Sequence, residues 1–375
     1  INLTAQIDDS DLQDLGGASS QVADNMDEMA VGAVATGAAL KRLVLPAALV
    51  TGIGAGVNSL LDFDTGIREV STLLTDVPVE GIAGLRDEVL AFSSDIGRTG
   101  QEVVPALYNA LSAGVPQDNV FDFLETANQV AIAGVTDTNT AVNGLTSVVN
   151  AYTGELKINE RAAADVLFTT IRLGKTTFPE LERQLGDVVP TANAMGLSFD
   201  QVGAAIAQLT AAGLSTPKAT TALNTALAEL SKPTSQLSVA FQEVTGQRVP
   251  EFIAAGNDLG DVMAAIGEAA ENTEGGIAAL AGLESAKALN ILSGDLDTLE
   301  SNLAETGNSA GATSAAYEKM QGDGLLLSQS LARLKNSGTE LFIAFEPLIS
   351  TAVNGVAAFA EWVATSPRVQ AAIDG

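Results

Sequence analysis

Few residues of this chain could carry chemistry. Its 375 residues include no histidine and no cysteine, which excludes imidazole triads, thiolate nucleophiles, disulfides and Cys/His zinc sites together. Carboxylate, lysine, tyrosine and hydroxyl chemistry remain. Acidic residues are abundant enough to supply a carboxylate pair of the glycosidase type, but no pair is singled out by its spacing. We therefore predict a protein without catalytic residues, cofactor or metal.

Three motifs resemble ligand-binding loops and fail on spacing or context. Gly174-Lys175-Thr176 is similar to the end of a phosphate-binding P-loop, but Thr169 occupies the place of the first glycine and the preceding pattern is helical. The segment Gly52–Gly56 resembles a dinucleotide-binding loop, yet Val57 replaces its third glycine. Asp62–Gly66 begins like a calcium loop but brings its glycine one position early, so we interpret it as a turn that links helices.

The elements that would position any such residue are predicted to be helical. Hydrophobic residues make up 46% of the chain but aromatic residues only 4%, a composition that suits closely packed helices. Capping-box patterns at Thr99–Glu102, Thr177–Glu180 and Ser198–Gln201 indicate helix starts, as does Pro217. Glycines where helices should stop recur about every twenty residues: Gly97, Gly114, Gly134, Gly154, Gly174, Gly196 and Gly213. The predicted fold class is all-α, an elongated array of short amphipathic helices with a leading heptad or coiled-coil segment.

Composition and helix punctuation divide the chain into five segments. They are a polar initial segment (1–21), a heptad helix with an apolar segment (22–61), a helical domain (62–246), a second helical region (247–335) and an apolar amphipathic C-terminal helix (336–375). A short non-helical excursion is expected at Gln247–Phe252. The segments from Ala133 and from Ala212 also look alike, which indicates either a weak internal duplication or chance similarity among Ala/Thr-rich helices.

Two apolar faces are candidate interaction sites. The first has heptad spacing and predicts either an oligomer seam or a lone amphipathic helix packed on its own domain: Val22, Met26, Met29, Ala33, Leu40 and Leu43. The second reads as an amphipathic helix that awaits a partner or a membrane surface: Leu341, Phe342, Phe345, Leu348 and Trp362.

The charge of the chain argues against nucleic-acid binding. It carries 46 acidic and 18 basic residues, a net charge of −28. Duplex DNA is bound by clusters of Lys and Arg that release counterions, and no basic run here is longer than Lys41-Arg42. We therefore predict no specific nucleic-acid binding. The acidity indicates either solubility, or an origin in salty water, or a surface that DNA passes without adhering.

Four segments occur in the order in which similar segments occur in the tape-measure proteins of tailed phages: Tyr108–Gly114, Ala131–Gly134, Arg172–Phe178 and Leu209–Gly213. The chain resembles that family from about Leu43 to Ala372. The resemblance implies a structural virion protein inside the tail tube and tail tip, with roles in tail assembly, length determination and genome delivery. It also implies partners: copies of itself (a trimer), tail-tube subunits, baseplate or tail-tip hub proteins and, during ejection, the host envelope.

Two departures and two alternatives accompany this resemblance. The chain is short for a tape measure and lacks a long repetitive coiled coil, which favours an anchoring or delivery domain near one end of the tail. A membrane-active, pore-forming protein that uses 31–61 and 341–363 is the first alternative, because the mean hydropathy of +0.25 is high for so acidic a chain. A soluble cell-wall hydrolase is the second.

Overall fold

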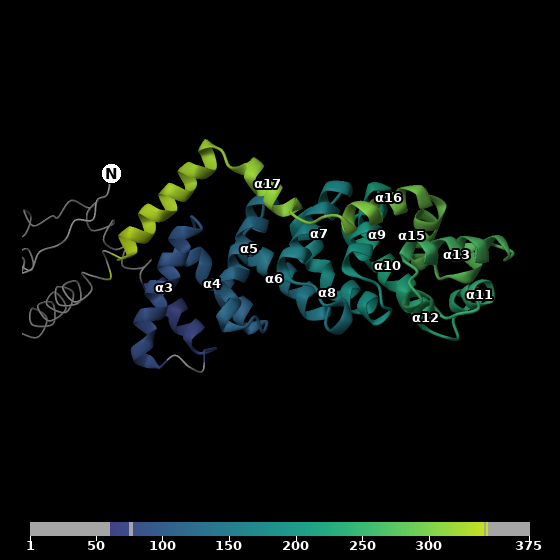
Figure 1. The fold of residues 1–375 in the computed structure, drawn as a ribbon, viewed down its shortest axis with the longest axis horizontal. Helices are drawn as coiled ribbons and strands as arrows, with labels where there is room; N and C mark the ends of the chain where they lie inside the picture. Colours follow the sequence, from purple (N-terminus) through teal and green to yellow (C-terminus); the bar gives the residue numbers. More distant parts are fainter. Residues whose placement is uncertain (1–60, 75–77, 341–342, 344–375) are drawn as a thin grey trace, which may run out of the picture. The chain divides into compact units, whose positions relative to one another are not determined.

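The computed structural model describes residues 61–74, 78–340 and 343. All of them belong to Ser59–Gly375, the second of the two units into which the chain divides. Within these residues the secondary structure consists of helices and their connections, with no strand (Figure 1). The all-helical prediction is therefore confirmed for this part of the chain, whereas the predicted leading coiled coil lies outside it.

The helices are short, and most span 9 to 17 residues. The first helices are α3 (Ile82–Asp95), α4 (Gly100–Ser112), α5 (Val120–Ala133), α6 (Thr138–Ala151), α7 (Glu160–Leu173), α8 (Phe178–Ala194), α9 (Phe199–Ala211) and α10 (Thr216–Ser231). The later ones are α11 (Gln236–Thr245), α12 (Val249–Ala254), α13 (Leu259–Glu271), α14 (Ile277–Leu280), α15 (Leu283–Gly294), α16 (Leu296–Gly307) and α17 (Ala312–Met320). Further helices run over 61–71 and 323–340, and single 3-10 turns are η2 (Val79–Gly81), η3 (Gln117–Asn119) and η4 (Gly154–Leu156).

Successive helices from α4 to α10 alternate between two layers. Each helix packs against the helix after next in the chain, as α4 does against α6 and α7 against α9. One layer therefore holds α4, α6, α8 and α10, and the other holds α5, α7 and α9. The first layer continues into α15 and the second into α16 (Figure 1). Such a stack of helix pairs is the arrangement of an α-solenoid, and it makes this unit an elongated array as predicted.

The stack has a regular period. The helices α4, α6, α8 and α10 begin at residues 100, 138, 178 and 216, so equivalent helices recur after 38, 40 and 38 residues. One helix pair and its two turns therefore occupy about 39 residues. The similar segments that begin at Ala133 and Ala212 lie 79 residues apart, which is close to two such periods.

Small residues let neighbouring helices of the same layer approach closely. A Cβ atom at Gly203 of α9 would lie 2.5 Å from Thr170 Oγ1 of α7. The ring of Phe178 lies beside Gly144, where a Cβ would come within 3.0 Å of it. Since protein interiors are packed as densely as crystals, a methyl group at either glycine would force the helices apart.

A few large side chains fill the remaining core. Tyr152 is fully buried, packs on Phe199, and donates a hydrogen bond of 3.0 Å from its hydroxyl to the carbonyl oxygen of Leu197. Burial, with a smaller contribution from the charge of Asp200, raises the pKa of the Tyr152 phenol. The side chain is therefore neutral and acts as a donor that ties the end of α6 to the turn before α9.

The predicted helix starts are confirmed in part. Thr99 forms the expected capping box: the backbone N–H of Glu102 donates to its side chain, and the Glu102 carboxylate accepts from the Thr99 N–H. Thr177 and Ser198 are N-cap residues by position, but the prediction of capping boxes there is wrong, because their side chains make no cap hydrogen bond. In the α7–α8 turn, the hydroxyl of Thr176 instead lies 2.7 Å from that of Thr216.

Two further expectations are corrected. Residues 246–248 are non-helical, but the helix α12 begins at Val249, so most of the predicted excursion at Gln247–Phe252 is helical. Asp62–Gly66 is not a turn: it lies inside the helix over 61–71, where a Cβ at Gly66 would meet Val104 at 2.6 Å. Gly66 therefore serves helix packing. The spacing of the residues in this segment does not distinguish a packing glycine from a turn glycine.

The predicted stop glycines fall into three groups. Four adopt the left-handed conformation in which glycine is favoured at a helix end: Gly97, Gly114, Gly196 and Gly213. Gly134 and Gly174 end their helices with negative φ angles of −88° and −95°. Gly154 has a positive φ but opens η4 rather than closing α6, so the prediction of a helix stop is wrong there.

In the turn after α5, the left-handed residue stands at the usual second position after the helix, but it is a valine rather than a glycine. Val135 has a φ of 52°, the only positive φ outside glycine in the described residues. Gly134 stands just before it, and a Cβ there would meet the Phe178 side chain at 3.4 Å and the carbonyl of Val130 at 2.9 Å. The glycine therefore serves packing, and the strained conformation falls on a β-branched residue, where it is costly.

We expect Val135→Gly to stabilise the protein by about 1 kcal/mol, since it removes a left-handed β-branched residue whose side chain is 79% exposed and contributes little packing. Urea unfolding monitored by circular dichroism measures the change. Val239→Gly, at an exposed position inside α11, is the matched control and should destabilise. A loss of stability in Val135→Gly would show that the backbone at this turn is not strained.

Candidate interaction surface

The two apolar faces predicted from the sequence, over 22–43 and 341–362, lie outside the described residues and stay predictions. The same holds for the segment Gly52–Gly56. Among the residues that the structure does describe, no helix is long and apolar enough to cross a membrane. A candidate site therefore has to be sought on the array itself.

The P-loop-like segment is engaged in helix packing. It follows the helix α7 rather than a strand, and a Cβ at Gly174 would lie 2.5 Å from Thr210 Oγ1. The backbone N–H of Gly174 donates to Thr170 O at 2.9 Å, and that of Lys175 donates to Thr210 Oγ1 at 3.1 Å. Because these donors already have partners inside the protein, they do not form the open cradle that binds phosphate.

Acidic side chains are numerous but dispersed. In residues 61–74 and 78–340 no group of three acidic residues is placed to hold a metal ion. Asp64, which belongs to the calcium-loop-like segment, instead pairs with Arg68 one helical turn later, at 2.7 Å. Asp64 is therefore engaged in an ion pair on the helix surface.

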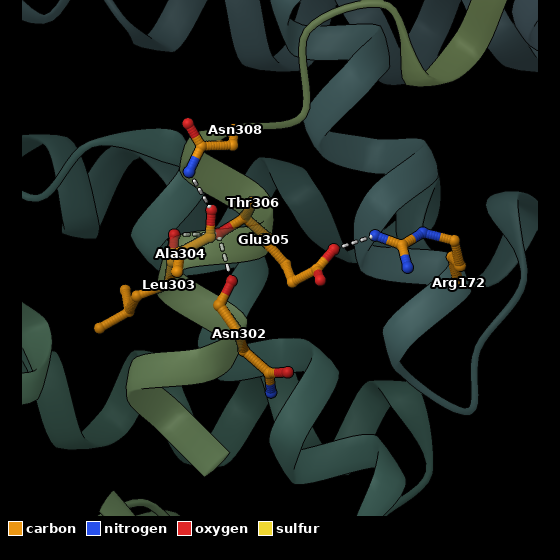
Figure 2. A network of polar contacts seen from close by, with 7 residues as sticks. All are labelled: Arg172, Asn302, Leu303, Ala304, Glu305, Thr306 and Asn308. Atoms are coloured by element: carbon orange, nitrogen blue, oxygen red, sulfur yellow. Dashed lines mark hydrogen bonds and ion pairs between the residues drawn. The ribbon is translucent and has the colours of Figure 1, made fainter. Parts of the chain in front are cut away.

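The C-terminal helices of the described region return along the array. In Figure 2, Arg172 of α7 forms an ion pair of 2.6 Å with Glu305 of α16. The hydroxyl of Thr306 donates to the carbonyl of Asn302, and the amide of Asn308 donates to the carbonyl one turn before it. Both ion-pair partners are half-exposed, so the pair contributes less than about 1 kcal/mol, and it orients the end of α16 rather than holding it.

A buried carboxylate fixes the next helix. Asp165 of α7 is 9% exposed, and it accepts hydrogen bonds from the backbone N–H groups of Gly311 at 2.7 Å and Thr313 at 2.9 Å. These groups belong to the first turn of α17, whose N–H donors have no partner within the helix. The carboxylate thereby holds α17 across α5 and α7.

The helix over 323–340 packs through a side that buries Ala332, Asn336 and Thr339. Asn336 is buried: its Oδ1 accepts from the Gly100 N–H at 3.0 Å, and its Nδ2 donates to Arg98 O at 2.7 Å and Ser94 Oγ at 3.1 Å. Arg333 Nε donates to Ser94 O at 2.9 Å. This face of the helix is therefore held to the α3–α4 corner by hydrogen bonds.

The opposite side of the same helix is apolar and exposed. Leu327, Leu331 and Leu334, which we call the leucine row, are 62%, 51% and 68% exposed. Leu326 beside them is 53% exposed. An amphipathic helix on a folded domain ordinarily buries its apolar stripe, whereas this helix leaves its apolar stripe exposed to solvent. The leucine row is thus the candidate interaction surface.

The sequence contains a pattern that could have predicted this surface, but a predicted segment boundary divides the helix that carries it. The leucine row has the 4-and-3 spacing of a heptad seam, but the second helical region was predicted to end at 335, inside that helix. No interaction face is therefore predicted from the sequence at these leucines. Only the structure shows that Asn336 points inward, and hence that the leucines point outward.

We expect Asp165→Ala to release the start of α17. The variant loses two charge-assisted hydrogen bonds, together worth about 2 kcal/mol or more, so amide hydrogen exchange in 311–320 should accelerate. Asp258→Ala, which removes the equivalent cap of α13, is the control and should accelerate exchange only there. Unchanged exchange at 311–320 in Asp165→Ala would show that packing alone holds α17.

Comparisons with known proteins agree on one family. The profile of the family described as "Phage-related minor tail protein" matches residues 86–294, more than half of the chain. A "Probable tape measure protein" of Clostridium phage phiCD119 is 32% identical over 332 residues, which cover 83% of this chain and 34% of that protein. The "Tape measure protein" of Pneumococcus phage Dp-1 is 22% identical over 179 residues, 46% of this chain and 15% of that protein.

The matched part of the chain thus spans about a third or less of the length of these relatives. No solved structure matches the chain. The helices from α3 to α15 span the residues matched by the family profile. On the extent of the profile match and the 32% identity over 83% of its residues, the chain belongs to the phage tail tape-measure family.

Proposed function

We propose that this chain is part of a structural virion protein of a tailed phage, a tape measure protein in the lumen of the tail tube and tail tip. Its role is in tail assembly and genome delivery, without catalysis. The observation that carries the proposal is the 32% identity to a probable tape measure protein over 83% of the chain. The absence of histidine and cysteine from the sequence is compatible with a structural role.

Within such a protein, the array serves as an anchoring or delivery domain rather than as the ruler. A continuous helix gains about 58 Å in length from 39 residues at 1.5 Å each. The same residues stacked as one helix pair extend the array by about one interhelical distance, near 10 Å. Length determination therefore belongs to more extended parts of the protein, and the array contributes little to it.

The partners of the array follow from this proposal. They are tail-tube subunits, baseplate or tail-tip hub proteins and further copies of the chain, with a trimer as the expected assembly and the seam over 22–43 as one contact. The host envelope is a further partner during ejection. A net charge of −28 repels the DNA that passes along the lumen, which favours release of the genome over its retention.

Protection from protease in intact virions tests the location. In purified particles of the phage that encodes this chain, we expect the chain to stay uncut until DNA ejection is triggered, and to be cleaved afterwards, because the tube excludes protease. An outer capsid protein cut under both conditions is the control. Absence of the chain from virions, or cleavage before ejection, would contradict the proposal.

Deletion of one period separates an anchor from a ruler. Removing residues 160–198 from the full-length gene joins the N-cap Asn159 to Phe199, the start of α9, and stacked repeats tolerate such a loss. For a compact array we expect tails shortened by no more than about 10 Å, measured by electron microscopy. Tails shortened by about 58 Å would instead show that these residues measure length as a continuous helix.

A further inference from the structure

The leucine row leaves apolar area in water that the array does not cover. Burying a leucine side chain is worth roughly 1.5–3 kcal/mol, and each of its three leucines is more than half exposed. Single exposed leucines are normal, but a contiguous row on one helix marks a site of association. Since the side that buries Asn336 holds this helix in place, the row can be covered only by something outside the described array.

The spacing of the row indicates another helix as the occupant. Leu327, Leu331 and Leu334 follow one another by four and three residues, the spacing that aligns one stripe of a helix with an equivalent stripe on a partner. In the sequence the same register continues at Gly338, Leu341 and Phe345, before Pro347. Two of these positions belong to the apolar C-terminal face predicted from the sequence.

The charge of the segment indicates a second copy of this chain. With a net charge of −28, two copies repel each other unless the faces that meet carry no carboxylates. No acidic residue occurs between Asp323 and Glu340, and the charged residues there are Arg333 and Lys335. This helix therefore offers a stretch through which two such acidic chains can approach.

The residues that flank the row are compatible with a parallel pair. In heptad register the flanking positions are Ser328, Ser330, Lys335 and Ser337. In a parallel pair, a flanking residue of one helix meets the residue five positions later on its partner. Ser330 then faces Lys335 of the other copy, and no like charges meet.

We propose that the leucine row pairs, in parallel and in register, with the leucine row of a second copy of this chain. The hydrogen bonds of Asn336 and Arg333 orient the helix for this contact, so pairing requires no unpacking from the α3–α4 corner. The contact is a property of the chain itself and does not depend on where the protein lies in a virion.

Disulfide trapping in the full chain tests the contact, because the native sequence has no cysteine. Leu327→Cys and Leu334→Cys, each alone, should form covalent dimers under mild oxidation, since paired helices hold seam residues within the 4.4–6.8 Å Cα separation that a disulfide needs. Leu326→Cys is the matched control: it is similarly exposed on the same helix but lies off the seam. We expect its rate of cross-linking to be at least about tenfold lower, since pairing raises the local concentration only of thiols on the seam.

Each outcome is decisive. Equal cross-linking at 326, 327 and 334 would show random collision and overturn the proposal. Cross-linking only when Leu327→Cys and Leu334→Cys are mixed would show antiparallel pairing and overturn the stated orientation. No cross-link at either seam position overturns the contact even if the chain associates elsewhere, for example through 22–43.

Light scattering gives a second readout. We expect the wild-type mass to exceed the 38.2 kDa of one chain, and L331E/L334E to weaken association at least tenfold with unchanged circular dichroism. Leu283→Glu, at a leucine that is 79% exposed in α15, is the control and should leave association unchanged. Equal association of L331E/L334E and wild type would also overturn the proposal. A failed proposal here leaves the virion location untouched, since protease protection measures that separately.

Discussion

The close approach of helices through small side chains is the constraint on which this structure depends. With aromatics at 4%, the array cannot rely on bulky residues to fill wide gaps between its helices. Gly203 against Thr170 and Gly174 against Thr210 instead bring α7 and α9 together, at distances that leave no room for a methyl group. Packing at this density is sensitive to single atoms, so a methyl group at Gly203 or Gly174 would disturb the contact between α7 and α9.

The backbone conformation of the turns is determined by this packing. At Gly114 and Gly213 the glycine takes the left-handed conformation that ends a helix. At Gly134 the same residue type is needed beside Phe178, and Val135 takes the strained conformation instead. Strain at an isolated position persists when the surrounding contacts determine the backbone. The core between the layers therefore takes precedence over local turn preference in this chain.

The last described helices are attached by a different kind of interaction. Asp165 holds the start of α17, and Asn336 holds the helix over 323–340, both through hydrogen bonds to backbone groups. Buried polar groups of this kind specify one orientation, because every alternative leaves a donor or acceptor without a partner. That specificity turns the leucine row outward and makes an interaction surface of a helix whose leucines would otherwise be expected to enter the core.

The sequence by itself determined the helical class, the approximate helix ends and the absence of imidazole and thiol chemistry. These depend on residue type and on contacts within a few positions, as the capping box at Thr99–Glu102 illustrates. The seam over 22–43 stays a prediction from spacing alone. Only the tertiary structure decided the two-layered stack, the packing role of Gly66 and Gly174, and the outward direction of the leucine row. Each of these depends on a partner distant in the sequence, such as Asn336 on Gly100, and local pattern carries no information about which distant residue fills a given space.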